Sequence, residues 1–170
     1  MKNPLLGPLC ALALVAVVAC DDTTEPVSKI VTFKATLTPS AEVPTPPVAS
    51  SGSGTFTATL DTSTNVFTYD LTFTGLTSAV NNGHIHGPAA TGVTAGSTIN
   101  FNTLTGATFS FGQTSGTGHG TVVLSSGTAI TSTINGDSLK KLLFAGLTYA
   151  NIHTTSNPAG EIRGQITKQP

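Results

Sequence analysis

The sequence predicts an all-β domain, an antiparallel Greek-key-like β-sandwich with one short helix near residues 137–145. Apolar and polar side chains alternate at period two in several separate segments, as they do in half-buried strands. Turns rich in glycine, proline and serine separate these segments, among them TPSAEVPTPPVASSGSG and LDTSTN. Helical periodicity is nearly absent, so we expect many short antiparallel strands packed in two layers.

Each expected strand is defined by its own run of alternating residues. The first should start near Ile30, and its apolar face consists of Val31, Phe33, Ala35 and Leu37. The other runs are TFTATL, VFTYDLTFTGL, ATFSF, GTVVL and EIRGQI. Their alternation suits a sheet with one face on the core. One segment, NGDSLKKLLFAG, instead predicts the short helix, with Asp137 or Ser138 as its N-cap.

The first 19 residues predict a lipoprotein signal peptide. Lys2 precedes an apolar run that is too short to cross a bilayer, and VVAC ends at Cys20 before the polar DDTTEPVSK. Because this junction resembles a bacterial lipobox, we expect cleavage after residue 19 and a lipid anchor on Cys20. Residues 20–29 would form a flexible tether and residues 30–168 the domain. The protein would then be an exported lipoprotein on the periplasmic or cell-surface side of a membrane. An ordinary secretory signal is the alternative.

The low charge of the chain excludes one class of partner. Only 9% of the residues are charged and the formal net charge is −1, so no basic surface is available to bind a phosphate backbone. Nucleic acid is therefore not expected as a partner. The two cysteines are Cys10, in the signal peptide, and Cys20. The domain must therefore be stabilised by its core rather than by a disulfide.

Two parts of the chain are similar to each other. The segments GTFTATL…LTFTGLTSAVNNGHIHGPAATG and GTVVLSS…LLFAGLTYANIHTTSNPAG share Gly-Thr, an apolar strand, GLT, Ile-His and then glycine. The matched residues are Gly75, Ile85, His86 and Gly92 in the first segment and Gly146, Ile152, His153 and Gly160 in the second. This similarity indicates two copies of one Greek-key-like unit. A chance match among abundant threonine and glycine is the alternative.

Three further motifs resemble a known family. They are ATLTPSAEVPTPP followed by GSGTFTATLD, the central LTFTGLT…GHIHGPA, and the closing LFAGLTYANIHTTSNPAGEIRGQI. From about Thr32 to Ile166 the chain resembles a CHRD domain, a module named for chordin and widespread in bacterial secreted proteins and lipoproteins. The segment from Gly92 to Gly120 fits the pattern less well. The resemblance implies no agreed activity, and the ligands that chordin sequesters outside animal cells do not transfer to this chain.

The stretch GHIH carries the chemistry of most interest. In a strand, His84 and His86 share one face while Ile85 points into the core. Two imidazoles on one face can chelate a copper or zinc ion, and His153 could supply a third nitrogen if the two similar segments pair. The alternative, which the sequence favours, is that the histidines only hydrogen-bond the loops at the strand ends. Glu161 and Arg163 are the expected supporting residues, since either could bond a neighbouring histidine. The fourth histidine, in GTGHGT, is expected in an exposed turn.

The inventory of reactive groups argues against catalysis. The expected architecture is that of immunoglobulin domains and superoxide dismutases, and copper–zinc superoxide dismutases also have a His-X-His strand and an arginine near the end of the chain. This chain lacks their zinc loop, their disulfide pair and enough histidines for two ions. It also lacks a nucleophile motif, a free cysteine and the aromatic platforms that paired carboxylates use on sugars. We therefore expect no enzyme activity.

Three functions remain, from different classes. The sequence favours a membrane-anchored, non-enzymatic binding or structural module for an envelope protein or glycan, with no cofactor. The second is a copper or zinc protein that uses His84, His86 and His153. The third, a redox enzyme built on that metal, would also require an open coordination position and turnover.

Overall fold

The computed structural model describes residues 29–104 and 106–170. The predicted signal peptide, Cys20 and most of the predicted tether lie outside the described residues. The elements are β1 (Ile30–Leu37), η1 (Pro39–Ala41), β2 (Ser53–Asp61), β3 (Val66–Thr74), β4 (Val80–His86), β5 (Ser97–Asn100), β6 (Thr108–Phe109), β7 (Gly116–Val123), α1 (Gly136–Phe144), β8 (Thr148–Thr154) and β9 (Ile162–Lys168). Within the described residues, no helix is both long and apolar enough to cross a membrane.

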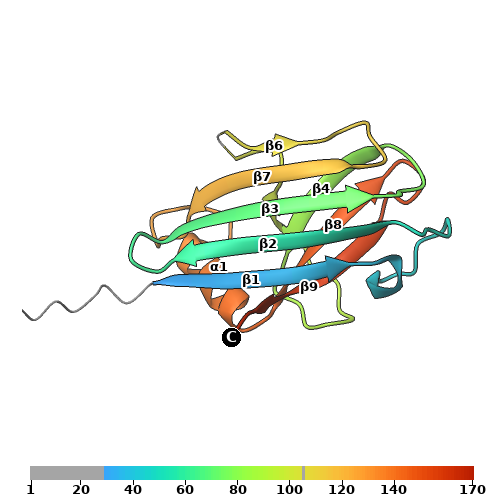
Figure 1. Ribbon diagram of the computed structural model, residues 1–170. Coiled ribbons are helices and arrows are strands. Elements are labelled where there is room, and N and C mark those ends of the chain that lie inside the picture. Colours follow the sequence, from blue (N-terminus) through green and yellow to red (C-terminus); the bar gives the residue numbers. More distant parts are fainter. Residues whose placement is uncertain (1–28, 105) are drawn as a thin grey trace, which may run out of the picture.

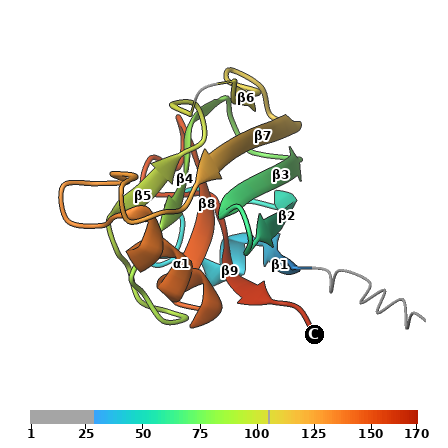
Figure 2. The same ribbon diagram turned by 90° about the vertical axis from the view of Figure 1, so that its left-hand side faces the viewer.

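All of the strands join one antiparallel sheet, with the order β5-β4-β8-β9-β1-β2-β3-β7-β6. The sheet curls into a half-barrel, with β1, β2, β3 and β7 on one side and β4, β5 and β8 on the other (Figures 1 and 2). The predicted all-β class is therefore confirmed. The two separate layers of the predicted sandwich are not seen, because β9 bonds to both halves and makes them one sheet.

The join between the halves depends on a close approach of β1 and β9. These strands pair at Phe33 with Lys168 and at Lys34 with Thr167, and a further bridge links Thr38 to Arg163. Between these points a side chain on residue 164 would collide with the backbone carbonyl of Thr36. Glycine at position 164 is what lets the two strands come together there.

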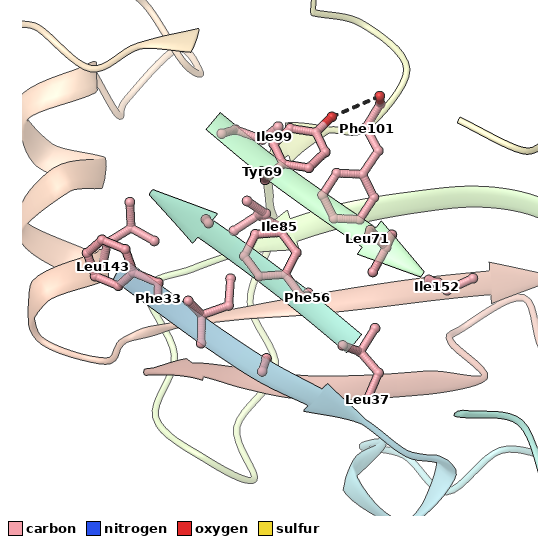
Figure 3. Close-up of a cluster of buried hydrophobic side chains, with 14 of the residues drawn as sticks. Phe33, Leu37, Phe56, Tyr69, Leu71, Ile85, Ile99, Phe101, Leu143 and Ile152 are labelled. Atoms are coloured by element: carbon pink, nitrogen blue, oxygen red, sulfur yellow. Dashed lines mark hydrogen bonds between the residues drawn. The ribbon is translucent and has the colours of Figure 1, made fainter. Parts of the chain in front are cut away.

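The predicted alternation places the core correctly. Phe33, Phe56 and Tyr69 are fully buried, and the Tyr69 hydroxyl donates a 3.0 Å hydrogen bond to the carbonyl of Phe101 (Figure 3). Ile85 and Ile152, from the other half of the sheet, complete the same cluster. One core therefore fills the curl, with apolar side chains from both halves meeting inside it.

Some strand boundaries differ from the expected ones. The run ATFSF yields only the two residues of β6, and β7 starts at Gly116, ahead of the run GTVVL. The sequence did not predict β5, which lies in the poorly patterned segment after Gly92. These strands are short or glycine-rich, so their period-two signal is weak.

The predicted short helix is present as α1, which begins one residue earlier than expected. Its N-cap is Asn135 rather than Asp137 or Ser138, because the Asn135 side chain accepts a hydrogen bond from the backbone N–H of Ser138. Leu139 and Leu143 are buried and anchor the helix against the core beside β9. The helix covers one end of the curl (Figure 2).

The outward face of β8 is also buried, unlike that of an ordinary half-exposed strand. Every residue of β8 is buried except His153, which is partly exposed. The loop at residues 87–96 lies over this face, since Ala89, Val93 and Ala95 accept hydrogen bonds from β9 and β4 side chains. A polar interior thus forms outside the sheet, between the strands and the covering loops.

Candidate metal centre

The neighbouring strands β4 and β8 bring three histidines together. Ile85 and Ile152 point into the core, so His84, His86 and His153 point outward from the sheet. The antiparallel register places His84 opposite Asn151 and Asn82 opposite His153. The predicted grouping of His84 and His86 on one face is therefore present, and the structure adds His153 to it.

The geometry of the three rings suits a single ion. One ligand nitrogen from each histidine lies within 4.8 Å of the other two. His84 Nδ1 and His153 Nε2 are 3.1 Å apart and form a hydrogen bond. Three imidazole nitrogens form a common protein ligand set for copper or zinc.

Backbone carbonyls orient two of the rings. His86 Nδ1 donates to the carbonyl of Ala95 at 2.9 Å, and His153 Nδ1 donates to that of Pro158 at 3.0 Å. These bonds fix the tautomers, so each ring presents the lone pair of Nε2. Metal-binding histidines are held in the same way by a partner on their other nitrogen. The Nε2 atom of His86 is buried and has no hydrogen-bond partner.

The electrostatic surroundings keep the three rings neutral. Burial lowers the pKa of His84 to about 4, assisted by the neighbouring His153 and His86. Burial also lowers the pKa of His86 to about 4, and the charge of Arg163 contributes in the same direction. The pKa of His153 is lowered by burial too. Neutral imidazole is the form that binds a metal, so the centre is ready to bind at neutral pH.

Arg163, a predicted supporting residue, contacts the aromatic ring of Tyr149, which in turn stacks on His86. The Tyr149 ring stacks on His86, with centroids 4.7 Å apart and planes 1° from parallel. The guanidinium carbon of Arg163 lies 3.4 Å from the centroid of the same ring. Because β8 lies between β4 and β9, Tyr149 is held between His86 and Arg163. Arg163 also donates a 2.6 Å hydrogen bond to the carbonyl of Val93.

Glu161, the other predicted supporting residue, lies in a different network. Its carboxylate accepts hydrogen bonds from the hydroxyls of Ser50 and Thr154 and from the backbone N–H and hydroxyl of Thr77. Although burial opposes ionisation, these bonds lower the pKa of Glu161. None of its hydrogen bonds comes from a histidine. Its contacts tie three separate segments of the chain together.

The sequence analysis did not single out two buried residues beside the centre, Glu42 and Asn151. Glu42 lies in the loop after β1, and one of its carboxylate oxygens accepts a hydrogen bond from Asn151. Burial raises the pKa of Glu42 to about 8, although Arg163 and Asn151 act in the opposite direction. The only signal was a lone acid in an otherwise uncharged, proline-rich stretch.

The fourth histidine, His119, lies far from a turn. It is in the middle of β7, and its side chain is about half exposed. Its Nδ1 atom is 2.8 Å from a carboxylate oxygen of Asp70 on the neighbouring strand. The prediction of an exposed turn residue was therefore right about exposure and wrong about the turn.

The comparisons with known proteins identify the family. The family model described as CHRD domain matches residues 33–166, which is most of the chain. The chain therefore belongs to the CHRD-domain family, as its motifs suggested. No curated protein and no solved structure matches it significantly.

Proposed function

We propose that this CHRD-domain protein binds one copper or zinc ion through His84, His86 and His153, without turnover. The observation that carries the proposal is the grouping of the three rings, with one ligand nitrogen of each within 4.8 Å of the others, together with the buried Nε2 atom of His86, which has no hydrogen-bond partner among the described residues. A histidine with a purely structural role would have both ring nitrogens satisfied, since an unpaired buried polar atom is costly. The alternative favoured by the sequence, loop anchoring alone, accounts for Nδ1 of His86 and leaves Nε2 unexplained.

The experiment is a titration of the purified protein with copper(II) and zinc. We expect one ion per chain, with copper binding more tightly than zinc because nitrogen ligands follow that order. Changing His84 and His86 together to alanine should abolish binding, while His119→Ala, a matched change of an exposed histidine, should leave it intact. Absence of stoichiometric binding, or binding that survives the double change, would refute the proposal.

We also propose that the domain works outside the cytoplasm, anchored to a bacterial membrane by lipid on Cys20. The lipobox-like junction at VVAC supports this assignment. Mass spectrometry of the membrane-extracted protein tests it: an acylated N-terminal Cys20 is expected. A protein that keeps residues 1–19, or that starts elsewhere without acyl chains, would rule out the anchor.

A second function, binding of an envelope glycan, is supported by a different surface. A groove of about 500 Å³ crosses the outward face of β9, β1 and β2. Six of its nine lining residues carry a hydroxyl or amide group, namely Thr36, Thr55, Thr57, Gln165, Thr167 and Gln169. Such groups match the hydroxyls of a neutral sugar polymer better than they match a charged partner.

Co-sedimentation with peptidoglycan sacculi tests the glycan proposal. We expect Thr57→Glu to weaken sedimentation by placing a charge in the groove. Thr121 on β7 also points outward but lies outside the groove, so the matched change Thr121→Glu should have no effect. Equal sedimentation of both variants, or none by the unaltered protein, would contradict this function.

A further inference from the structure

We propose that the histidine centre selects copper(I) over copper(II) and zinc, because its ligands are uncharged and Arg163, a buried residue stacked beside it, is positive. This inference rests on the proposed metal site and adds the oxidation state of the ion. It depends on which charges lie near the three rings and on how firmly they are held.

The ligand set supplies no negative charge. The group of possible ligands found among the described residues consists of three histidines and no carboxylate or thiolate. Copper(I) bound there gives a centre of charge +1, whereas copper(II) or zinc gives +2. In a partly buried site the second charge is costly, because the low dielectric leaves it poorly screened.

Arg163 adds to that cost from a fixed position. Its side chain is only 2% exposed, and it is held by the Tyr149 ring and by the carbonyl of Val93. A guanidinium stays protonated at every pH at which the protein is folded. In this stack the Tyr149 ring lies between this charge and His86.

Among the described residues, no carboxylate forms an ion pair with Arg163. Glu42, the buried acid beside Asn151, is neutral at pH 7 because burial raises its pKa to about 8. Glu161 is ionised, since its hydrogen bonds lower its pKa, and those bonds come from Ser50, Thr77 and Thr154 rather than from Arg163.

The test compares affinities for the two oxidation states in the full chain, kept in mild detergent. Cys10 and Cys20 are both changed to serine, so that no thiolate competes for copper(I). Copper(I) affinity is measured anaerobically against a chromophoric copper(I) chelator, and copper(II) affinity against a copper(II) chelator. We expect Arg163→Gln to shift the ratio of the two dissociation constants toward copper(II) by at least tenfold, which for a one-electron couple is about 59 mV in reduction potential.

Two variants separate charge from packing. Arg163→Lys keeps the positive charge and should retain most of the preference, whereas Lys34→Gln removes an exposed cation of β1 and should leave the ratio unchanged. A ratio within twofold of the original in Arg163→Gln would overturn the inference. If that variant does not fold, the copper(II)/copper(I) reduction potential of the unaltered protein is the test. A reduction potential below that of aqueous copper would overturn the inference. Failure to retain copper in either oxidation state would instead refute the metal site itself.

Discussion

Gly75 and Gly146 adopt the same left-handed backbone conformation, each with φ of +67°, although 71 positions separate them in the chain. Both precede Leu-Thr and lead into a histidine-bearing strand. This conformation strongly favours glycine, because most L side chains rarely adopt a positive φ. The matched glycines further on, Gly92 and Gly160, also have positive φ values of 80° and 137°.

The similarity between the two segments is limited to this part of the chain. The two histidine strands, β4 and β8, pair with each other, with the repeated Ile-His pairs offset along them, since Ile85 lies opposite Ala150 and Ile152 opposite Gly83. In the first segment the run before GLT is strand β3, which pairs with β2, whereas the corresponding run in the second segment, LLFA, lies at the end of helix α1. Two complete copies of one unit, as the sequence indicated, are therefore not formed.

Metal affinity should be insensitive to pH over an unusually acidic range. Ordinary histidine sites lose their metal as the rings protonate near pH 6.5. The pKa values of His84 and His86 are lowered to about 4, so the rings compete little with protons until the pH approaches 4. We expect zinc affinity to be nearly constant between pH 7 and 5.5 and to fall steeply below pH 4.5. Titrations at fixed ionic strength measure it, and a tenfold loss by pH 6 would contradict the assignment.

The join between the two halves of the sheet should be sensitive to one methyl group. In Gly164→Ala the new Cβ would collide with the carbonyl of Thr36, a backbone atom that can move only if β1 and β9 separate. We expect a loss of roughly 2–3 kcal/mol in the free energy of unfolding, as for other overpacked sites. Gly127→Ala is the control, because nothing lies within 4 Å of its Cβ position. The midpoint of urea unfolding should therefore be markedly lower for Gly164→Ala than for Gly127→Ala. Equal midpoints would count against this account of the join.

Glu161→Gln should destabilise the protein without affecting metal binding. The carboxylate of Glu161 accepts all of its hydrogen bonds, and an amide would turn an NH₂ group toward donors such as the Thr77 N–H. A cost of roughly 1–3 kcal/mol is expected for the unsatisfied groups. Asp70→Asn, at an exposed carboxylate, should cost much less. Thermal unfolding gives the comparison, and reduced copper binding in Glu161→Gln would show that Glu161 does support the histidines.

Glu42→Gln should stabilise the protein at alkaline pH. The folded pKa of Glu42 is about 8 and its ordinary value is 4.5, so between these values the folded chain holds a proton that the unfolded chain has lost. Stability attributed to this group is therefore greatest below pH 4.5 and falls as the pH rises through 8. The variant cannot ionise, so its melting temperature relative to the original should rise from pH 5 to pH 9. A constant difference across that range would show that Glu42 ionises normally.

The sequence predicted the β class, the core faces of β1, β2 and β3, and the existence of α1, since each depends on a local pattern. Phe33, Phe56 and Tyr69 occupy the inward positions that period-two alternation assigns to them. The curl of the sheet could not be read in the same way, because it depends on which distant strands become neighbours. Two separate layers and one bent sheet bury the same alternating residues.

The candidate site was predicted in its ligands but not in its surroundings. His84 and His86 share a face by simple alternation, whereas their meeting with His153 required the pairing of β4 with β8. The carbonyls of Ala95 and Pro158 that orient the rings carry no sequence signature, because every residue has one. Tyr149 and Glu42 gain their roles only from burial beneath the covering loops.

The strand order also governs when the centre can exist. His84 and His86 are made well before His153, and β4 acquires its partner β8 only after α1 and everything between them has been synthesised. A chain still emerging from a ribosome therefore offers at most two of the three nitrogens of the proposed site. Loading of that site would have to follow release of the finished chain, so the metal supply at the place of folding would decide which ion is bound.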